Sequence, residues 1–256
     1  MKTLFLFKAA GAWSLFFLSF ASLAQSTHLS DFAGESLKYE IRWFGLKAGE
    51  VDIRVRNITF NTDPAIQIYA FIHSAHWFSS IYYVEDSITS ILDPQTMLPL
   101  KISVDYREGK KYKRKTDYLF DYKEHKVISI QTNKQSKVLL LPPNVIDLFG
   151  VFFLLRMSDF SKNTTLVRDV VDGRRVYKVE TKLVSTSLLS TILGEKECLE
   201  LQPSRIHLEM ENKNQKVSEI LLFLTNDSKR IPVMIKIKID FGNFVIKLVN
   251  YQKSHE

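Results

Sequence analysis

A chain of 256 residues with a single cysteine and a formal net charge of +7 is large enough to bury a core without disulfides or metals. Because Cys198 is alone, the sequence excludes an internal disulfide, a Cys-x-x-Cys redox pair and a zinc site built from several cysteines. The positive charge is modest and spread along the chain, which favours anionic surfaces such as lipid head groups.

Residues 1–24 have the pattern of a secretory signal peptide. Lys2 and Lys8 supply the positive end, residues 9–21 are apolar, and small residues precede Gln25. The apolar run is shorter than the roughly 20 residues that cross a bilayer, and an uncleaved anchor is the competing interpretation. We therefore expect one β domain at residues 25–256, with no transmembrane span. Export without disulfides fits a bacterial periplasm or cell envelope, where nucleic acid is not an expected partner.

Alternating apolar and polar residues predict antiparallel strands through the first half of this domain. Residues 38–43 and 51–55 flank a glycine-containing turn and predict a hairpin. Further strands are predicted at residues 65–72, 82–92, 100–106, 112–120, 127–131 and 138–141. The last of these ends at two prolines, which lack the backbone donor that a ladder needs.

A different period follows the prolines. Residues 144–159 are apolar on all sides, which predicts one buried helix, with a pair of buried strands as the alternative. We expect Asn144 to be the N-cap and Asp147 to occupy N3, where a carboxylate meets the positive end of the helix. Gly150 inside the helix indicates a close approach by another backbone.

Strand patterns then resume. They lie at residues 166–171, 175–183, 195–201, 204–209, 217–224, 231–240 and 244–249, with Pro203 separating the third from the fourth. About a dozen strands and one helix predict a mainly β protein, either a large antiparallel curved sheet or an open barrel with one buried apolar helix.

Nine segments occur in a recognisable order over nearly all of the predicted domain. They are residues 32–39, 45–49, 83–86, 93–94, 98–99, 147–156, 172–174, 194–203 and 224–233. This order resembles the DUF3108 family of exported bacterial proteins of unknown function. The resemblance implies an antiparallel β domain behind a signal peptide and carries no activity. In outline such domains are similar to periplasmic lipoprotein carriers, which fold an open barrel around a hydrophobic cavity; that likeness is one of architecture only.

The sequence contains no recognisable catalytic motif. It has no Gly-x-Gly pair, no Gly-x-Ser-x-Gly elbow and no His-Glu-x-x-His helix, so we expect no cofactor, no metal and no enzymatic activity. His73 and His76 have no evident third ligand and are interpreted as surface or turn residues. Cys198 lies in a strand pattern and is interpreted as a small core residue.

Two groups of residues remain as candidates for binding. Phe149, Phe152 and Phe153 either plug the barrel or line a cavity for an acyl chain. Lys111, Lys113 and Lys115 share one strand face, where they protect a sheet edge or bind the phosphates of lipid head groups.

The leading hypothesis is therefore a non-enzymatic envelope protein that binds or carries a hydrophobic or lipid-like ligand. The alternatives are an envelope scaffold that holds a protein partner and, third, an enzyme acting on envelope glycan, which convergent carboxylates in a cleft would favour.

Overall fold

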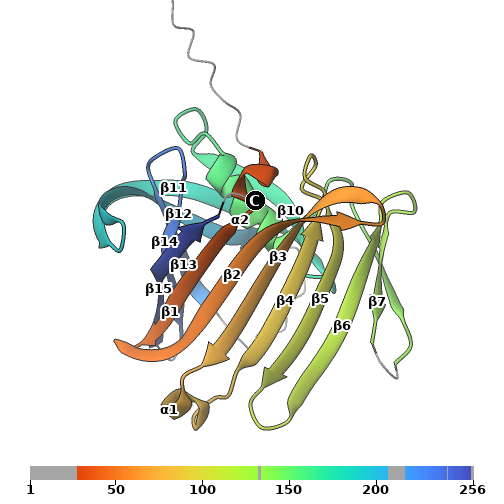
Figure 1. The fold of residues 1–256 in the computed structure, drawn as a ribbon, viewed down its shortest axis with the longest axis horizontal. Helices are drawn as coiled ribbons and strands as arrows, with labels where there is room; N and C mark the ends of the chain where they lie inside the picture. The colour runs from red at the N-terminus through yellow and green to blue at the C-terminus, as the bar shows by residue number, and fades with distance from the viewer. Residues whose placement is uncertain (1–27, 132–133, 207–216, 241, 255–256) are drawn as a thin grey trace, which may run out of the picture.

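The computed structural model describes residues 28–131, 134–206, 217–240 and 242–254 (Figure 1). The predicted signal peptide at residues 1–24 lies outside these ranges. The described residues form one sheet of 15 strands, two α-helices and a 3-10 helix. The helical elements are η1 (Leu29–Phe32), α1 (His76–Ser79) and α2 (Leu148–Met157). The strands are β1 (Glu35–Trp43), β2 (Leu46–Phe60), β3 (Asp63–Ser74), β4 (Glu85–Leu92), β5 (Pro99–Glu108), β6 (Tyr112–Asp121), β7 (Lys126–Ile130), β8 (Lys137–Leu140), β9 (Ile146–Asp147), β10 (Thr165–Val171), β11 (Val176–Thr191), β12 (Gly194–Ile206), β13 (Val217–Thr225), β14 (Pro232–Ile239) and β15 (Gly242–Lys253).

The sheet consists of two meanders. Their edge strands, β8 and β9, follow each other in the chain but lie at opposite edges of the sheet. Strands β1 to β8 follow one another on one side, strands β15 to β9 follow one another on the other side, and β1 pairs with β15 between them. Neighbouring strands are antiparallel except β9 and β10, which are parallel. Local hairpins therefore build most of the sheet, and the long-range pairing of β1 with β15 unites the two halves.

The sheet curls around α2, which lies with η1 at one end of the molecule, whereas α1 lies at the opposite end (Figure 1). Apolar side chains of α2 contribute to two of the core clusters, one with β10, β12 and β13 and the other with η1, β2, β3 and β4. The predicted curved β architecture with a buried apolar helix is thus confirmed.

Side-chain packing closes the seam between the two meanders. Val171 at the end of β10 shares a core cluster with Ile102, Val104 and Val127 from β5 and β7. The turn after β10 carries Gly173, and a Cβ atom there would lie 2.6 Å from Cγ of Tyr118 on β6. The sheet is consequently barrel-like, although the edge strands β8 and β9 are not hydrogen-bonded to each other.

The predicted helix boundaries at residues 144–159 were wrong at both ends. Helix α2 begins at Leu148, and its N-cap is Asp147, whose Oδ1 accepts a 2.6 Å hydrogen bond from the backbone N–H of Gly150. Asn144 instead has a φ of +59°, and the residues after it pair with β10 as strand β9. Tertiary pairing thus takes up the first predicted turn of the helix.

Two other sequence features have clear positions in the fold. A Cβ atom at Gly150 would lie 3.4 Å from the Met97 carbonyl oxygen, which is the close backbone approach expected there. Pro203 does not end a strand, because β12 continues through it to Ile206. It pairs with Thr181 of β11 and lies beyond Leu201, where the described ladder between β12 and β13 ends, so its missing N–H removes no described hydrogen bond to β13.

Gly173→Ala tests the closure of the seam, with Gly194→Ala as its matched control. Both glycines have similar positive φ values, +85° and +88°, but no atom lies within 4 Å of a Cβ at Gly194. Both variants should lose about 1 kcal/mol from backbone strain. Gly173→Ala should lose about 1–3 kcal/mol more, because the new methyl displaces the Tyr118 ring. Urea unfolding measures the difference, and equal losses would show that the ring contact is unimportant.

Candidate functional site

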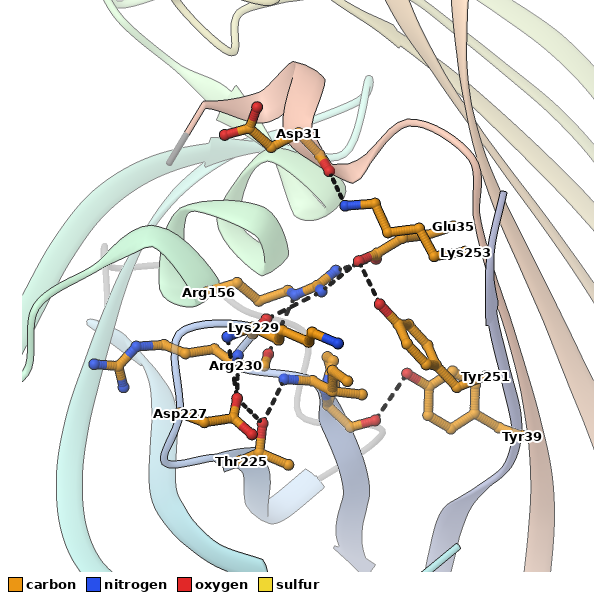
Figure 2. A network of polar contacts seen from close by, with 12 residues as sticks. Asp31, Glu35, Tyr39, Arg156, Thr225, Asp227, Lys229, Arg230, Tyr251 and Lys253 are labelled. Carbon is orange, nitrogen blue, oxygen red and sulfur yellow. Dashed lines mark hydrogen bonds and ion pairs between the residues drawn. The ribbon is translucent and has the colours of Figure 1, made fainter. Parts of the chain in front are cut away.

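A buried ion pair holds α2 against the sheet (Figure 2). Because α2 fills one end of the curled sheet, we call it the plug helix. Near the end of α2, Arg156 donates from Nη1 to Oε2 of Glu35 at 2.7 Å and from Nη2 to Oε1 at 3.0 Å. Glu35 begins β1, and its Oε1 also accepts a 3.0 Å hydrogen bond from the hydroxyl of Tyr251 on β15. The side chains of Arg156 and Glu35 are 0% and 2% exposed. The pair thus joins the helix to both strands at the junction of the two meanders.

The remaining donors of Arg156 bind the turn between β13 and β14. Nε donates to the carbonyl of Arg230 at 3.2 Å, and Nη2 donates to the carbonyl of Lys229 at 3.3 Å. The guanidinium carbon also lies 4.1 Å from the centre of the Phe32 ring, a distance suited to a cation–π contact. Burying a charge of this kind is tolerable because it is both paired and hydrogen-bonded.

Asp227 shapes the turn that receives Arg156. Its Oδ1 accepts hydrogen bonds from the backbone N–H groups of Lys229 at 3.0 Å and Arg230 at 3.1 Å, and from the Thr225 hydroxyl at 2.8 Å (Figure 2). The Thr225 hydroxyl in turn accepts a 2.8 Å hydrogen bond from the backbone N–H of Ile231. This Asx-type turn directs two carbonyl oxygens at the guanidinium.

Beyond α2, the inner face of the sheet is less completely covered. Val55, Ile68 and Leu92, on β2, β3 and β4, are 0–1% exposed at the end that holds the helix. On each strand, the apolar residue four positions away in the direction of α1 is partly exposed. These residues are Val51, Ile72 and Ile88. Residues four apart on a strand share a face, so the inner face of these strands passes from a filled end to a more open end. We call the open end the mouth.

A polar cluster lies at the mouth. The Tyr82 hydroxyl donates a 2.8 Å hydrogen bond to Oε2 of Glu108, and the backbone N–H of Arg107 donates a 2.9 Å hydrogen bond to Oδ1 of Asp86. Burial, together with the nearby Glu108 charge, raises the pKa of Asp86 to about 6. The hydrogen bond to Glu108 raises the pKa of Tyr82 to about 12. The two carboxyl groups therefore lie close enough for the charge of Glu108 to raise the pKa of Asp86.

Aromatic and cationic side chains surround this cluster. A cavity of about 530 Å³ is lined by Tyr82, Tyr106, Glu108, Tyr112 and Arg174. Beside it, the guanidinium carbon of Arg114 lies 5.0 Å from the centre of the Tyr106 ring. Nε of Arg114 is buried and has no hydrogen-bond partner among the described residues. The mouth thus offers apolar rings and a cationic donor in one place, which suits the head of an amphiphilic ligand.

The phenylalanines predicted from sequence lie at the filled end. Phe153 is 0% exposed and packs 5.0 Å from the centre of the Phe32 ring, so it fills the core. Phe149 and Phe152 are partly buried and pack against the same cluster. None of the three lines the mouth cavity described above.

The predicted lysines lie on the turn before β6 and along the strand itself. Lys111, Lys113 and Lys115 are all exposed. Lys111 and Lys113, together with Lys110, line a pocket of about 280 Å³ that Lys115 does not reach. Tyr82, Glu108 and Arg114 were not among the predicted site residues, because the pairing of β5 with β6 and the contact of Tyr82 with Glu108 form only in the folded chain.

Metal-binding groups are few in the described part of the chain. Oxygen and nitrogen atoms of Glu50, Asp52 and His73 lie within 4.8 Å of one another. However, Glu50 already pairs with Lys38 at 2.7 Å and with Lys47 at 2.5 Å, and these lysines hold its pKa down to about 2. The existing ion pairs leave this carboxylate little capacity for a metal ion.

The two histidines and the cysteine considered above as metal ligands or a nucleophile lie in separate surroundings. His73 lies on β3 whereas His76 begins α1. Cys198 is 0% exposed on β12, and burial raises the pKa of its thiol, which makes it a poor nucleophile.

Arg156→Met tests the ion pair. The substitution keeps an apolar side chain of similar length but leaves Glu35 buried without its cation, which should cost about 3–5 kcal/mol of unfolding free energy. Glu35→Gln should also destabilise the fold. The double variant should cost clearly less than the sum of the two single variants, because removing both charges leaves neither unpaired. Additive losses in urea unfolding would contradict this coupling.

Asp86→Asn tests the mouth cluster through its pH dependence. Because the folded-state pKa of Asp86 is raised from 3.8 to about 6, the stability present at lower pH is lost as the pH rises through that interval. The unfolding free energy of the parent protein, relative to that of Asp86→Asn, should therefore fall by about 1–2 kcal/mol between about pH 4 and about pH 7. Parallel pH profiles in urea unfolding would contradict the shift.

No curated protein matches the sequence. A β-barrel-like protein of the DUF1849 domain family from Brucella abortus matches the structure with a TM-score of 0.59 and 7% sequence identity. The match covers 88% of this chain and 99% of that one, and at such low identity it shows a shared fold alone. Among the described residues, no helix combines the length and hydropathy needed to cross a membrane. The model of the DUF3108 family, described as a protein of unknown function, matches residues 38–249, and the chain therefore belongs to that family.

Proposed function

We propose that this protein is a non-enzymatic envelope protein that binds a lipid-like amphiphile, with the apolar part of the ligand against the inner face of the sheet. The observation that carries this proposal is the change in burial along that face. Side chains beside α2 are fully covered, whereas Val51, Ile72 and Ile88 toward the mouth are partly exposed although they face inward. A ligand that covered them would gain roughly 25 cal/mol for each Å² of apolar surface removed from water.

The mouth supplies a place for the polar part of the ligand. Tyr82, Tyr106 and Tyr112 offer flat apolar rings with hydroxyl groups, and Arg174 offers a cation beside them. Nε of Arg114, which has no partner in the part of the chain that the structure describes, is one further donor that a head group can satisfy. The predicted signal peptide at residues 1–24 supports a periplasmic or envelope location, where such ligands occur.

A scaffold function is the second candidate, and one observation favours it. Among the described strands, β8 is an edge of the sheet that pairs with β7 alone, and its Val138 and Leu140 are 61% and 76% exposed. An open strand edge with apolar side chains can pair with an extended segment of another protein.

Native mass spectrometry of protein purified from its own envelope, followed by lipid extraction, tests the main proposal. We expect a copurifying amphiphile bound in a fixed ratio. Absence of any copurifying lipid, together with a stoichiometric protein partner after crosslinking, would replace the carrier proposal with the scaffold.

A pair of variants locates the ligand. Ile72→Trp places a large ring on the inner face near the mouth, whereas Thr89→Trp places the same ring on the outer face of the neighbouring strand β4. With a fluorescent fatty-acid analogue as the probe, Ile72→Trp should weaken binding by about tenfold or more through overpacking of the site. Thr89→Trp should leave it unchanged. Equal affinities for the two variants would place the probe elsewhere, and thermal melts of both variants control for misfolding.

A further inference from the structure

Three connections between strands form a continuous rim at the α1 end of the sheet (Figure 1). They are the β1–β2 turn, the segment from α1 to β4, and the β5–β6 turn. Trp77 of α1 donates a 2.6 Å hydrogen bond from Nε1 to the Lys47 carbonyl, which ties the first connection to the second. The backbone N–H of Gly109 donates a 2.8 Å hydrogen bond to the Tyr83 carbonyl, which ties the second to the third. We call this surface the rim.

Large apolar side chains project from the rim into solvent. Phe44 in the first turn and Leu46 at the start of β2 are 70% and 61% exposed, and Ile81 after α1 is 61% exposed. Trp77 and Tyr112 are 40% and 47% exposed. Tryptophan and tyrosine are the residues that proteins place at the level of lipid head groups, and neighbouring aliphatic side chains reach the acyl boundary.

The charge on the rim is predominantly positive once its ion pairs are considered. Lys47 pairs with Glu50 at 2.5 Å, and Arg107 pairs with Glu85 at 2.7 Å, so these acidic groups are already neutralised. Lys110, Lys111 and Lys113 form no ion pair within the described residues. They line the pocket of about 280 Å³ with Tyr83 and Arg107, directly beside the exposed Tyr112.

We propose that the rim docks onto the surface of an anionic phospholipid bilayer, with the lysine pocket on lipid phosphates and the apolar side chains in the interface. Charge complementarity selects this partner, because a cationic pocket bordered by exposed aromatic rings matches the anionic outer layer and apolar interior of such a bilayer. The lysine pocket and the exposed apolar side chains lie on the same rim, so one flat surface can contact both at once. This inference goes beyond the proposed ligand site and does not depend on it, since Phe44, Leu46 and the three lysines do not line the mouth cavity; Tyr112 borders both.

Cosedimentation with vesicles tests the proposal. We expect the protein to bind vesicles of phosphatidylethanolamine mixed with phosphatidylglycerol, to bind pure phosphatidylcholine vesicles far more weakly, and to be released by salt. The variant K110S/K111S/K113S should partition roughly a hundredfold more weakly, at about fivefold for each lysine. The control K123S/K162S/K229S removes the same charge from exposed lysines at the α2 end and should bind as the parent does.

A second pair of variants tests the apolar contribution. F44S/L46S should weaken binding to the anionic vesicles about tenfold or more. The control L140S/L188S removes side chains that are 76% and 69% exposed outside the rim and should have no effect. Circular dichroism confirms that each variant is folded.

Three results would overturn the proposal. They are absence of binding to anionic vesicles, equal losses in the rim variants and their controls, and complete displacement from vesicles by inorganic phosphate, which would identify a site for the free ion. None of these results bears on the fatty-acid probe within the sheet, so the two proposals fail separately.

Discussion

The buried contact between Glu35 and Arg156 is the interaction on which this architecture depends. Two meanders of strands grow from opposite ends of the chain, and β1 and β15 unite them where Glu35 and Tyr251 meet. Arg156 brings the plug helix to that same place and also binds two carbonyls of the β13–β14 turn. Burying two opposite charges adds little net stability, because the cost of removing both from water offsets their attraction. A misplaced helix, however, would leave one buried charge without its partner, which is strongly destabilising. We infer that the pair specifies where α2 sits.

The position of α2 decides where the barrel is full and where it is open. The helix occupies one end, and the strand residues beside it are completely covered. It contains ten residues, which at 1.5 Å each is about 15 Å, less than the length of strands such as β2 with 15 residues. The inner face past the helix therefore remains partly exposed, and both the proposed ligand site and the rim belong to that end.

Much of the fold could be predicted from the sequence because alternation at period two is a local property. The strands on either side of residues 45–49 and of Gly173, and the apolar helix, were all predicted from neighbouring residues. The start of α2 was not, because the parallel pairing of β9 with β10 joins segments that are distant in sequence. The mouth cluster was missed for the same reason: Asp86 and Glu108 lie on different strands, and only the register places them together. Arg156 did carry a signal, since it is a lone charge within an apolar run, and such a charge requires a buried partner.

The central claim is that the inner face at the mouth receives an apolar chain while α2 keeps the other end closed. A crystal structure of the protein soaked with a fatty acid brominated along its chain tests this most directly. The account predicts anomalous bromine density against Val51, Ile72 and Ile88, with the Glu35–Arg156 contact unchanged. Bromine density confined to the outer surface, or an inner face collapsed onto itself with no room for a chain, would contradict it.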